Sequence, residues 1–122
     1  MLIAVMMLAA ALAQQLAATP ELKIPVLDAR LGGDCSADFT VKDAEEKPIY
    51  AAAIYVRVRY GFLGIKRADL EVGTNSDGKA RIAGLSTKSK PLVYHIEESE
   101  RETTAEQDVK TNCQATFEVT LK

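Results

Sequence analysis

The sequence is poor in the residues on which several classes of function depend. Its 122 residues include no tryptophan, one histidine and two cysteines, and the formal net charge is only −2. Nucleic-acid binders carry a basic excess, and bases stack on aromatic side chains, so this composition argues against a nucleic-acid partner. Two cysteines would need the single histidine and more to hold zinc, so we expect no metal and no cofactor.

Catalytic groups are equally scarce. His95 is the one histidine, and the alternation of the surrounding residues places it opposite the apolar Tyr94 and Ile96, which predicts a surface position. No serine lies in the sequence context of a nucleophile elbow, and one histidine leaves little material for a triad. We therefore expect a protein that is not an enzyme. The alternative is a small hydrolase or isomerase built on a sandwich fold.

Long hydrophobic runs are also missing. The longest, residues 2–13, is shorter than the roughly 20 residues that a helix needs to span a bilayer. Its length, and the small residues of Ala11-Leu12-Ala13 before Gln14, are typical of a secretory signal peptide over residues 1–13, with a second candidate cleavage site after Ala18. No Lys or Arg precedes the run, so a buried N-terminal helix is the alternative. After removal of the signal we expect no membrane span.

Residues 14–34 contain two prolines and predict an extended N-terminal tether to the folded domain. Beyond that tether the chain keeps Cys35 and Cys113. An even number of cysteines in an exported protein favours a disulfide, and two unpaired buried thiols are the alternative. We therefore expect a secreted or periplasmic protein.

From residue 35 onward, apolar and polar side chains alternate in short runs. The clearest runs are residues 37–43, 53–60, 67–74 and 113–122. A period of two with one apolar face is what a strand covering a core requires. Residues 75–78, Asn-Ser-Asp-Gly, are a strong hairpin signal, and residues 99–108 are a weak helix candidate. The pattern predicts an all-β, immunoglobulin-like or transthyretin-like β-sandwich of six or seven strands over residues 35–122.

The two cysteines constrain the arrangement of the first and last strands. Cys35 alternates in phase with Phe39, and Cys113 with Phe117, so both cysteines are expected to point into the core at the start of their strands. Antiparallel neighbours would hold those starts about 20 Å apart, whereas a bridge needs Cα atoms within about 7 Å. A disulfide therefore predicts that these strands run parallel, side by side or across the sandwich.

Several stretches of the sequence are similar to one family. They are Phe39–Asp43, Lys47–Ile49, Ala52–Val56 and Thr74–Leu85. Together they resemble the carboxypeptidase regulatory-like domains, small transthyretin-like sandwiches of many exported bacterial proteins, over roughly residues 37–98. Glu46 and Ala51 stand where that family usually has glycine, so the first turn and the next strand entry are expected to differ. The resemblance implies an accessory module of the bacterial envelope without catalytic groups, and it carries over no functional residue.

Candidate binding residues come from the faces of the expected strands. Two pairs of cations each share a face: Arg57 with Arg59, and Lys79 with Arg81. If their strands are neighbours, the four residues form a basic patch suited to an acidic glycan or a protein partner. The alternative is a solvated face that discourages edge aggregation.

A second candidate is the loop Gly61-Phe62-Leu63-Gly64, which breaks two expected strands. Its apolar residues Phe62 and Leu63 would be exposed at the tip of a turn, which is unusual for a simple connection. The sequence thus favours an exported, non-enzymatic module that mediates protein or glycan interactions. The alternative is a small secreted inhibitor or ligand carrier that uses this loop.

Overall fold

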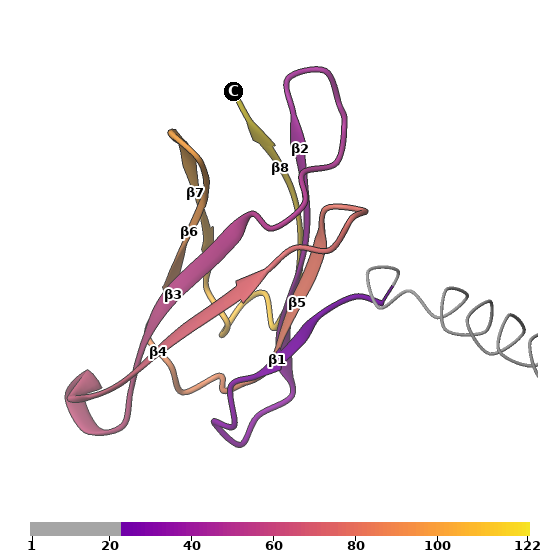
Figure 1. Cartoon of the computed structure of the whole chain (residues 1–122). Coiled ribbons are helices and arrows are strands. Elements are labelled where there is room, and N and C mark those ends of the chain that lie inside the picture. Colours follow the sequence, from indigo (N-terminus) through magenta and orange to yellow (C-terminus); the bar gives the residue numbers. More distant parts are fainter. Residues whose placement is uncertain (1–22) are drawn as a thin grey trace, which may run out of the picture.

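In a computed structural model, residues 23–122 form a β-sandwich of two four-stranded sheets, which confirms the expected all-β fold (Figure 1). The strands are β1 (Val26–Asp28), β2 (Cys35–Asp43), β3 (Ala53–Tyr60), β4 (Lys66–Gly73), β5 (Lys79–Leu85), β6 (Leu92–Glu98), β7 (Arg101–Gln107) and β8 (Gln114–Leu121). The predicted signal peptide and the start of the tether lie outside the described residues. No helix within residues 23–122 has the length and apolar character needed to cross a membrane.

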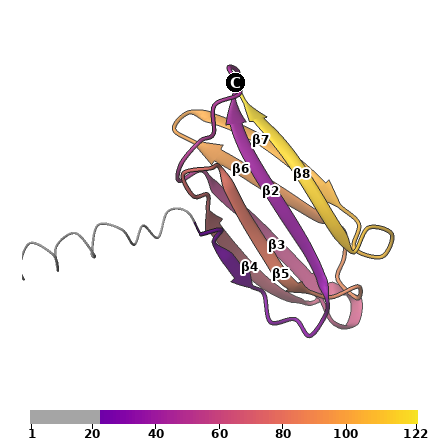
Figure 2. The same ribbon diagram turned by 90° about the vertical axis from the view of Figure 1, so that its right-hand side faces the viewer.

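Sheet A has the strand order β1-β5-β2-β8, and sheet B has the order β4-β3-β6-β7. Figure 2 shows sheet A in front of sheet B, with β2 and β8 running side by side. The pairs β1–β5 and β2–β8 are parallel, and the other neighbours are antiparallel. The connections therefore gather at the two ends of the sandwich, where loops distant in sequence meet.

The alternation in the sequence determines which side chains fill the core. In β3, Ile54, Val56 and Val58 are fully buried, whereas Arg57 and Arg59, which alternate with the valines, are exposed. The central side chains of the core are aromatic: Phe39 contacts Tyr94 edge-on and Phe117 in a stacked geometry, with ring centroids 4.9 and 5.2 Å apart. Burying a side chain of this size contributes about 1.5–3 kcal/mol to stability.

Cys35 and Cys113 form a disulfide, as the sequence predicted. Their Cα atoms are 4.5 Å apart, and they stand at matching ends of β2 and β8, which run parallel in register from Ser36 opposite Gln114 to Asp43 opposite Leu121. Of the two predicted arrangements, the strands are side by side rather than across the sandwich. A disulfide of this kind indicates that the chain folds in an oxidising environment.

A buried polar network holds the loop that leads into β8. The hydroxyl of Tyr94 donates to Gln107 Oε1 at 2.6 Å, and Gln107 Nε2 donates to the carbonyls of Ser36 and Asn112. Because these groups are buried and paired, the network fixes the end of β7 against the start of β2. Burial raises the pKa of the Tyr94 hydroxyl well above its usual value.

Two strands were not expected from the sequence. Residues 26–28, inside the expected tether, form β1, and the half-buried Leu27 packs against the core. A strand of three residues is too short to show alternation, and its pairing with β5 supplies its hydrogen bonds. The weak helix prediction for residues 99–108 is wrong, because residues 101–107 form β7. Its inward-facing positions include Thr103, Ala105 and Gln107. Because two of these three residues are polar, the strand shows no alternation of apolar and polar side chains in the sequence.

The Asn-Ser-Asp-Gly segment forms the expected tight turn but not a hairpin. Asn75 Oδ1 accepts hydrogen bonds from the backbone N–H groups of Asp77 and Lys79, and Gly78 has a φ of 74°. The strands that it joins, β4 and β5, belong to different sheets. The turn therefore carries the chain across the sandwich, a choice that the local sequence does not encode.

Candidate functional site

The structure separates the two cation pairs that the sequence analysis combined. Arg57 and Arg59 lie on the outer face of β3 in sheet B, whereas Lys79 and Arg81 lie on β5 in sheet A. The condition for a four-residue basic patch is therefore not met, because β3 and β5 are not neighbours. Arg81 is half-buried and pairs with Asp38 at 2.7 Å on the neighbouring strand.

Within the β3 pair, the two arginines have different surroundings. Arg57 faces Asp69 across the β3–β4 ladder, and its Nε lies 2.8 Å from Asp69 Oδ1. The hydrogen bond from Arg57, with a second from the Tyr55 hydroxyl, lowers the pKa of Asp69 below its usual value. Arg59 instead lies directly opposite Arg67. Like charges directly opposite each other destabilise a sheet. The Arg59–Arg67 pair therefore lowers the folding stability, and a bound anion would relieve the repulsion.

Next to this arginine pair, the turn between β3 and β4 presents apolar side chains to solvent. The turn contains a short 3-10 segment, Phe62–Gly64, with positive φ angles at the preceding Gly61 (78°) and at its last residue, Gly64 (68°). Phe62, Leu63 and Ile65 are 81%, 75% and 75% exposed. The expected exposed tip is thus present, and Ile65, which the sequence analysis did not single out, extends it.

Lysines from two segments complete the surroundings of the tip. Lys66 begins β4, and Lys90 comes from the β5–β6 connection, where its backbone N–H donates to the Arg59 carbonyl at 2.9 Å. The aliphatic carbons of Lys90 approach within 3.3 Å of the position that a Cβ on Gly64 would take. Glycine at this position therefore lets the lysine stem cross the turn. Sequence reasoning missed Lys90 because it lies 31 positions after Arg59 in the sequence.

We call this group of exposed residues the tip surface. It consists of Arg59, Phe62, Leu63, Ile65, Lys66, Arg67 and Lys90. A hollow of about 400 Å³ on its flank is lined by Arg59, Leu63, Gly64, Ile65 and Arg67. Among residues 23–122, none of the four cations of the tip surface forms an ion pair. The surface therefore combines exposed apolar side chains with four cations that form no ion pair in this part of the chain, although Asp69 on the same strand feels the charge of Arg67.

A shallow groove of about 190 Å³ continues from the tip surface along the outer face of sheet B. It is lined by Tyr55, Arg57, Arg59, Lys90, Pro91, Val93 and His95. His95 is exposed, as the sequence predicted, and its ring lies 6.1 Å from that of Tyr55. No group of three or more His, Cys, Asp or Glu side chains in the described part of the chain is placed to hold a metal ion.

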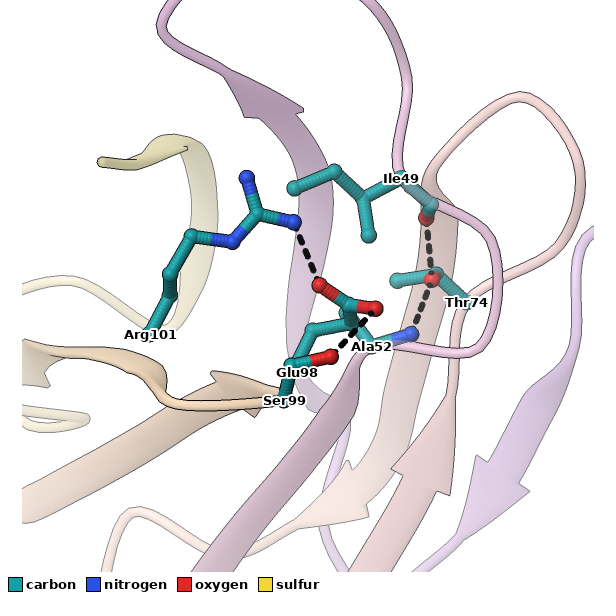
Figure 3. A network of polar contacts seen from close by, with 6 residues as sticks. All are labelled: Ile49, Ala52, Thr74, Glu98, Ser99 and Arg101. Atoms are coloured by element: carbon teal, nitrogen blue, oxygen red, sulfur yellow. Dashed lines mark hydrogen bonds and ion pairs between the residues drawn. The ribbon is translucent and has the colours of Figure 1, made fainter.

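The opposite end of the sandwich is held by polar contacts (Figure 3). Thr74 Oγ1 accepts from the Ala52 N–H at 2.9 Å and donates to the Ile49 carbonyl at 2.6 Å, which fixes the entry into β3. Glu98 accepts hydrogen bonds from Arg101 and from Ser99, which lower the pKa of its carboxyl group. The Thr74 contacts join the β2–β3 and β4–β5 connections, and the Glu98 contacts hold the turn between β6 and β7, so both groups of contacts stabilise the fold.

The two departures from the family pattern lie near that end. Ala51, next to the Thr74 contacts, has a φ of 60°, and Glu46 has a φ of 66°. Both values are in the left-handed region that glycine occupies most readily. Both positions therefore adopt a backbone conformation that glycine takes more readily than alanine or glutamate.

No protein-family model and no curated protein sequence matches this chain. Several solved structures are similar to it. Catechol 1,2-dioxygenase from Acinetobacter sp. ADP1, in a mercury-inhibited form, matches at 13% identity with a TM-score of 0.50, over 82% of this chain and 59% of the enzyme chain. The corresponding enzyme from Pseudomonas arvilla C-1 matches at 10% identity with a TM-score of 0.49, over 82% and 58%.

A third similar structure is the C-terminal domain of the shaft pilin SpaA from Lactobacillus rhamnosus GG. It matches at 11% identity with a TM-score of 0.44, over 74% of this chain and 99% of that domain. This chain spans less than two thirds of the length of the dioxygenases. The similarity to the Acinetobacter enzyme, at a TM-score of 0.50 and 13% identity, shows a shared β-sandwich fold alone, and a fold of this kind hosts many unrelated functions.

Proposed function

We propose that this chain is an exported, non-enzymatic binding module that engages an acidic partner of the cell envelope through the tip surface. The observation that carries the proposal is the pairing of Arg59 with Arg67 beside the exposed Phe62, Leu63 and Ile65. Opposed like charges and exposed apolar side chains both cost stability, and a binding surface is the physical reason to keep them.

Export is supported by two features of the chain. The Cys35–Cys113 disulfide indicates an oxidising environment, and the apolar run of residues 2–13 has the length of a signal-peptide core. The resemblance to carboxypeptidase regulatory-like domains supports an accessory role at a bacterial envelope. The left-handed backbone at Glu46 and Ala51, where that family usually has glycine, is in line with it.

A charge-reversal experiment tests the proposal. Purified wild-type protein is mixed with envelope fractions of the cells that make it, and the bound fraction is measured by sedimentation. We expect Arg59→Glu with Arg67→Glu to abolish binding while the melting temperature is maintained, because both side chains are exposed. Lys79→Glu with Lys122→Glu changes the net charge equally, away from the tip surface, and is expected to bind like the wild type.

The outcome of the matched pair decides the question. Equal loss of binding in both double variants would show that net charge alone governs the association, and the tip surface would not be the binding site. An absence of wild-type binding would equally contradict the proposal.

A further inference from the structure

Charge is sorted between the two ends of the sandwich. The tip surface lies at the end that carries the disulfide, opposite the C-terminus (Figures 1 and 2). The neighbouring connections there add Arg30, Lys88 and Lys110, against Asp34 and Asp108. The connections at the opposite end carry Glu45, Glu46, Asp77 and Glu100 against Lys47, and the segments before β1 and after β8 add Lys23 and Lys122, so this end has no cationic excess. This asymmetry directs the tip end toward a negatively charged partner.

The apolar residues and the cations of the tip surface occupy different parts of the chain. Phe62, Leu63 and Ile65 occupy the turn itself, whereas Arg59 and Lys66 stand at the adjoining ends of β3 and β4. The turn with its apolar residues lies at the end of the β3–β4 pair, and these cations lie on the adjoining strands. This order corresponds to that of a bilayer surface, in which the acyl chains lie below the charged headgroups. The apolar side chains would enter the boundary of the acyl chains, and the cations would remain at the level of the headgroup phosphates.

We infer that the tip surface docks onto the surface of an anionic lipid bilayer. This inference rests on the proposed binding function and names its partner. The chain would lie with the disulfide end toward the lipid and the opposite end away from it, since the opposite end has no cationic excess for the anionic headgroups to attract.

The shape of the tip favours lipid over the glycan or protein partners expected from the sequence. A glycan offers no apolar layer to accept three exposed aliphatic and aromatic side chains. A stable protein interface buries about 800 Å² on each partner, usually on a broad patch. A narrow turn does not provide such a patch, whereas a bilayer deforms around it.

The absence of tryptophan gives a direct reporter of insertion. In the Phe62→Trp variant of the full secreted chain, the introduced indole is the only one present. With vesicles of equal parts phosphatidylglycerol and phosphatidylcholine, we expect its emission to shift to shorter wavelength and to be quenched by brominated acyl chains. The Tyr50→Trp variant, in which a 62% exposed residue far from the tip is changed, should show neither effect.

Sedimentation with the same vesicles measures the contribution of each part of the tip surface. We expect Arg59→Gln and Arg67→Gln each to lower the partition constant about fivefold, the effect of one basic residue near an anionic surface. Phe62→Ser with Leu63→Ser should lower it by at least tenfold. The matched control Val26→Ser with Tyr50→Ser removes similarly exposed apolar side chains elsewhere and should leave it unchanged.

Two results would overturn the lipid inference. One is equal partitioning of the wild type into anionic and pure phosphatidylcholine vesicles, and the other is an unshifted emission of the Phe62→Trp variant on anionic vesicles. If envelope binding still required Arg59 and Arg67 in that case, the partner would be an envelope protein or glycan. The proposed function would then stand, and the lipid inference alone would fail.

Discussion

Replacement of Ala51 by glycine should stabilise this domain, against the usual effect of glycine. Ala51 has a φ of 60°, and its exposed side chain loses little packing on removal. An L-residue in the left-handed region costs about 1–2 kcal/mol, and glycine relieves that cost. The unfolded chain gains freedom worth about 0.4–1 kcal/mol, which offsets part of the benefit. We therefore expect a net gain of about 0.5–1 kcal/mol.

The backbone contacts of the site should survive the substitution. The Ala51 N–H donates to the Thr74 carbonyl at 3.0 Å, and glycine keeps that donor. Glu46 has the same kind of backbone conformation, with a φ of 66°, so Glu46→Gly should act in the same direction. Since each site has its own hydrogen-bond partners, the two gains should add to about 1–2 kcal/mol.

Urea unfolding followed by circular dichroism measures these differences directly, and thermal melts should show a rise of about 4 °C per site. Ala44→Gly is the matched control, because Ala44 is an exposed residue of the same loop without a positive φ. It should lower the free energy of unfolding by about 0.5 kcal/mol. If Ala51→Gly were as destabilising as Ala44→Gly, the reasoning from left-handed strain would be refuted.

Three further predictions concern the disulfide, the opposed arginines and the buried tyrosine. Cys35→Ala with Cys113→Ala opens a loop of sequence separation 78 and should lower the free energy of unfolding by about 4 kcal/mol in urea titrations; a loss below 1 kcal/mol would contradict the chain-entropy argument. Arg67→Glu should raise the free energy of unfolding by about 0.5 kcal/mol in the same assay, because it places a carboxylate directly across from Arg59. A loss of stability would contradict the conclusion that the two arginines repel each other. The pKa of Tyr94 is raised in the folded state, because burial favours the neutral hydroxyl. The folding stability linked to this neutral hydroxyl is fully present below the usual tyrosine pKa and is lost as the pH rises above about 10. Between pH 9 and 11, wild-type stability should fall about 1.4 kcal/mol more than that of Tyr94→Phe, and parallel pH profiles would contradict this prediction.

Much of the sandwich could be predicted because side-chain direction in a strand is a local property. The alternation around Val56 and Val58 identified the buried face of β3, and the phase of Cys35 with Phe39 identified an inward-facing cysteine. The requirement that two sulfurs meet then predicted parallel first and last strands. Each step needed only the period of two and the reach of a disulfide.

The candidate site could be predicted only in part, for the same physical reason. Phe62 and Leu63 were identified because glycines flank them in the sequence, which is a local turn signal. Lys90 was missed, since its place beside Arg59 depends on how the β5–β6 connection crosses the end of the sandwich. The joint patch with Lys79 depended on β3 and β5 being neighbours, and the sequence does not determine the strand order.

The sequence by itself determined which residues face inward, where the chain turns, and that Cys35 and Cys113 could meet. Only the tertiary structure decided which strands pair and in which sheet each one lies, because those choices depend on contacts between segments far apart in the chain. β1 became an edge strand through its pairing with β5, and four separate cations came together around one exposed turn. Local geometry sets the direction of a side chain, whereas the packing of the whole sandwich sets its neighbours.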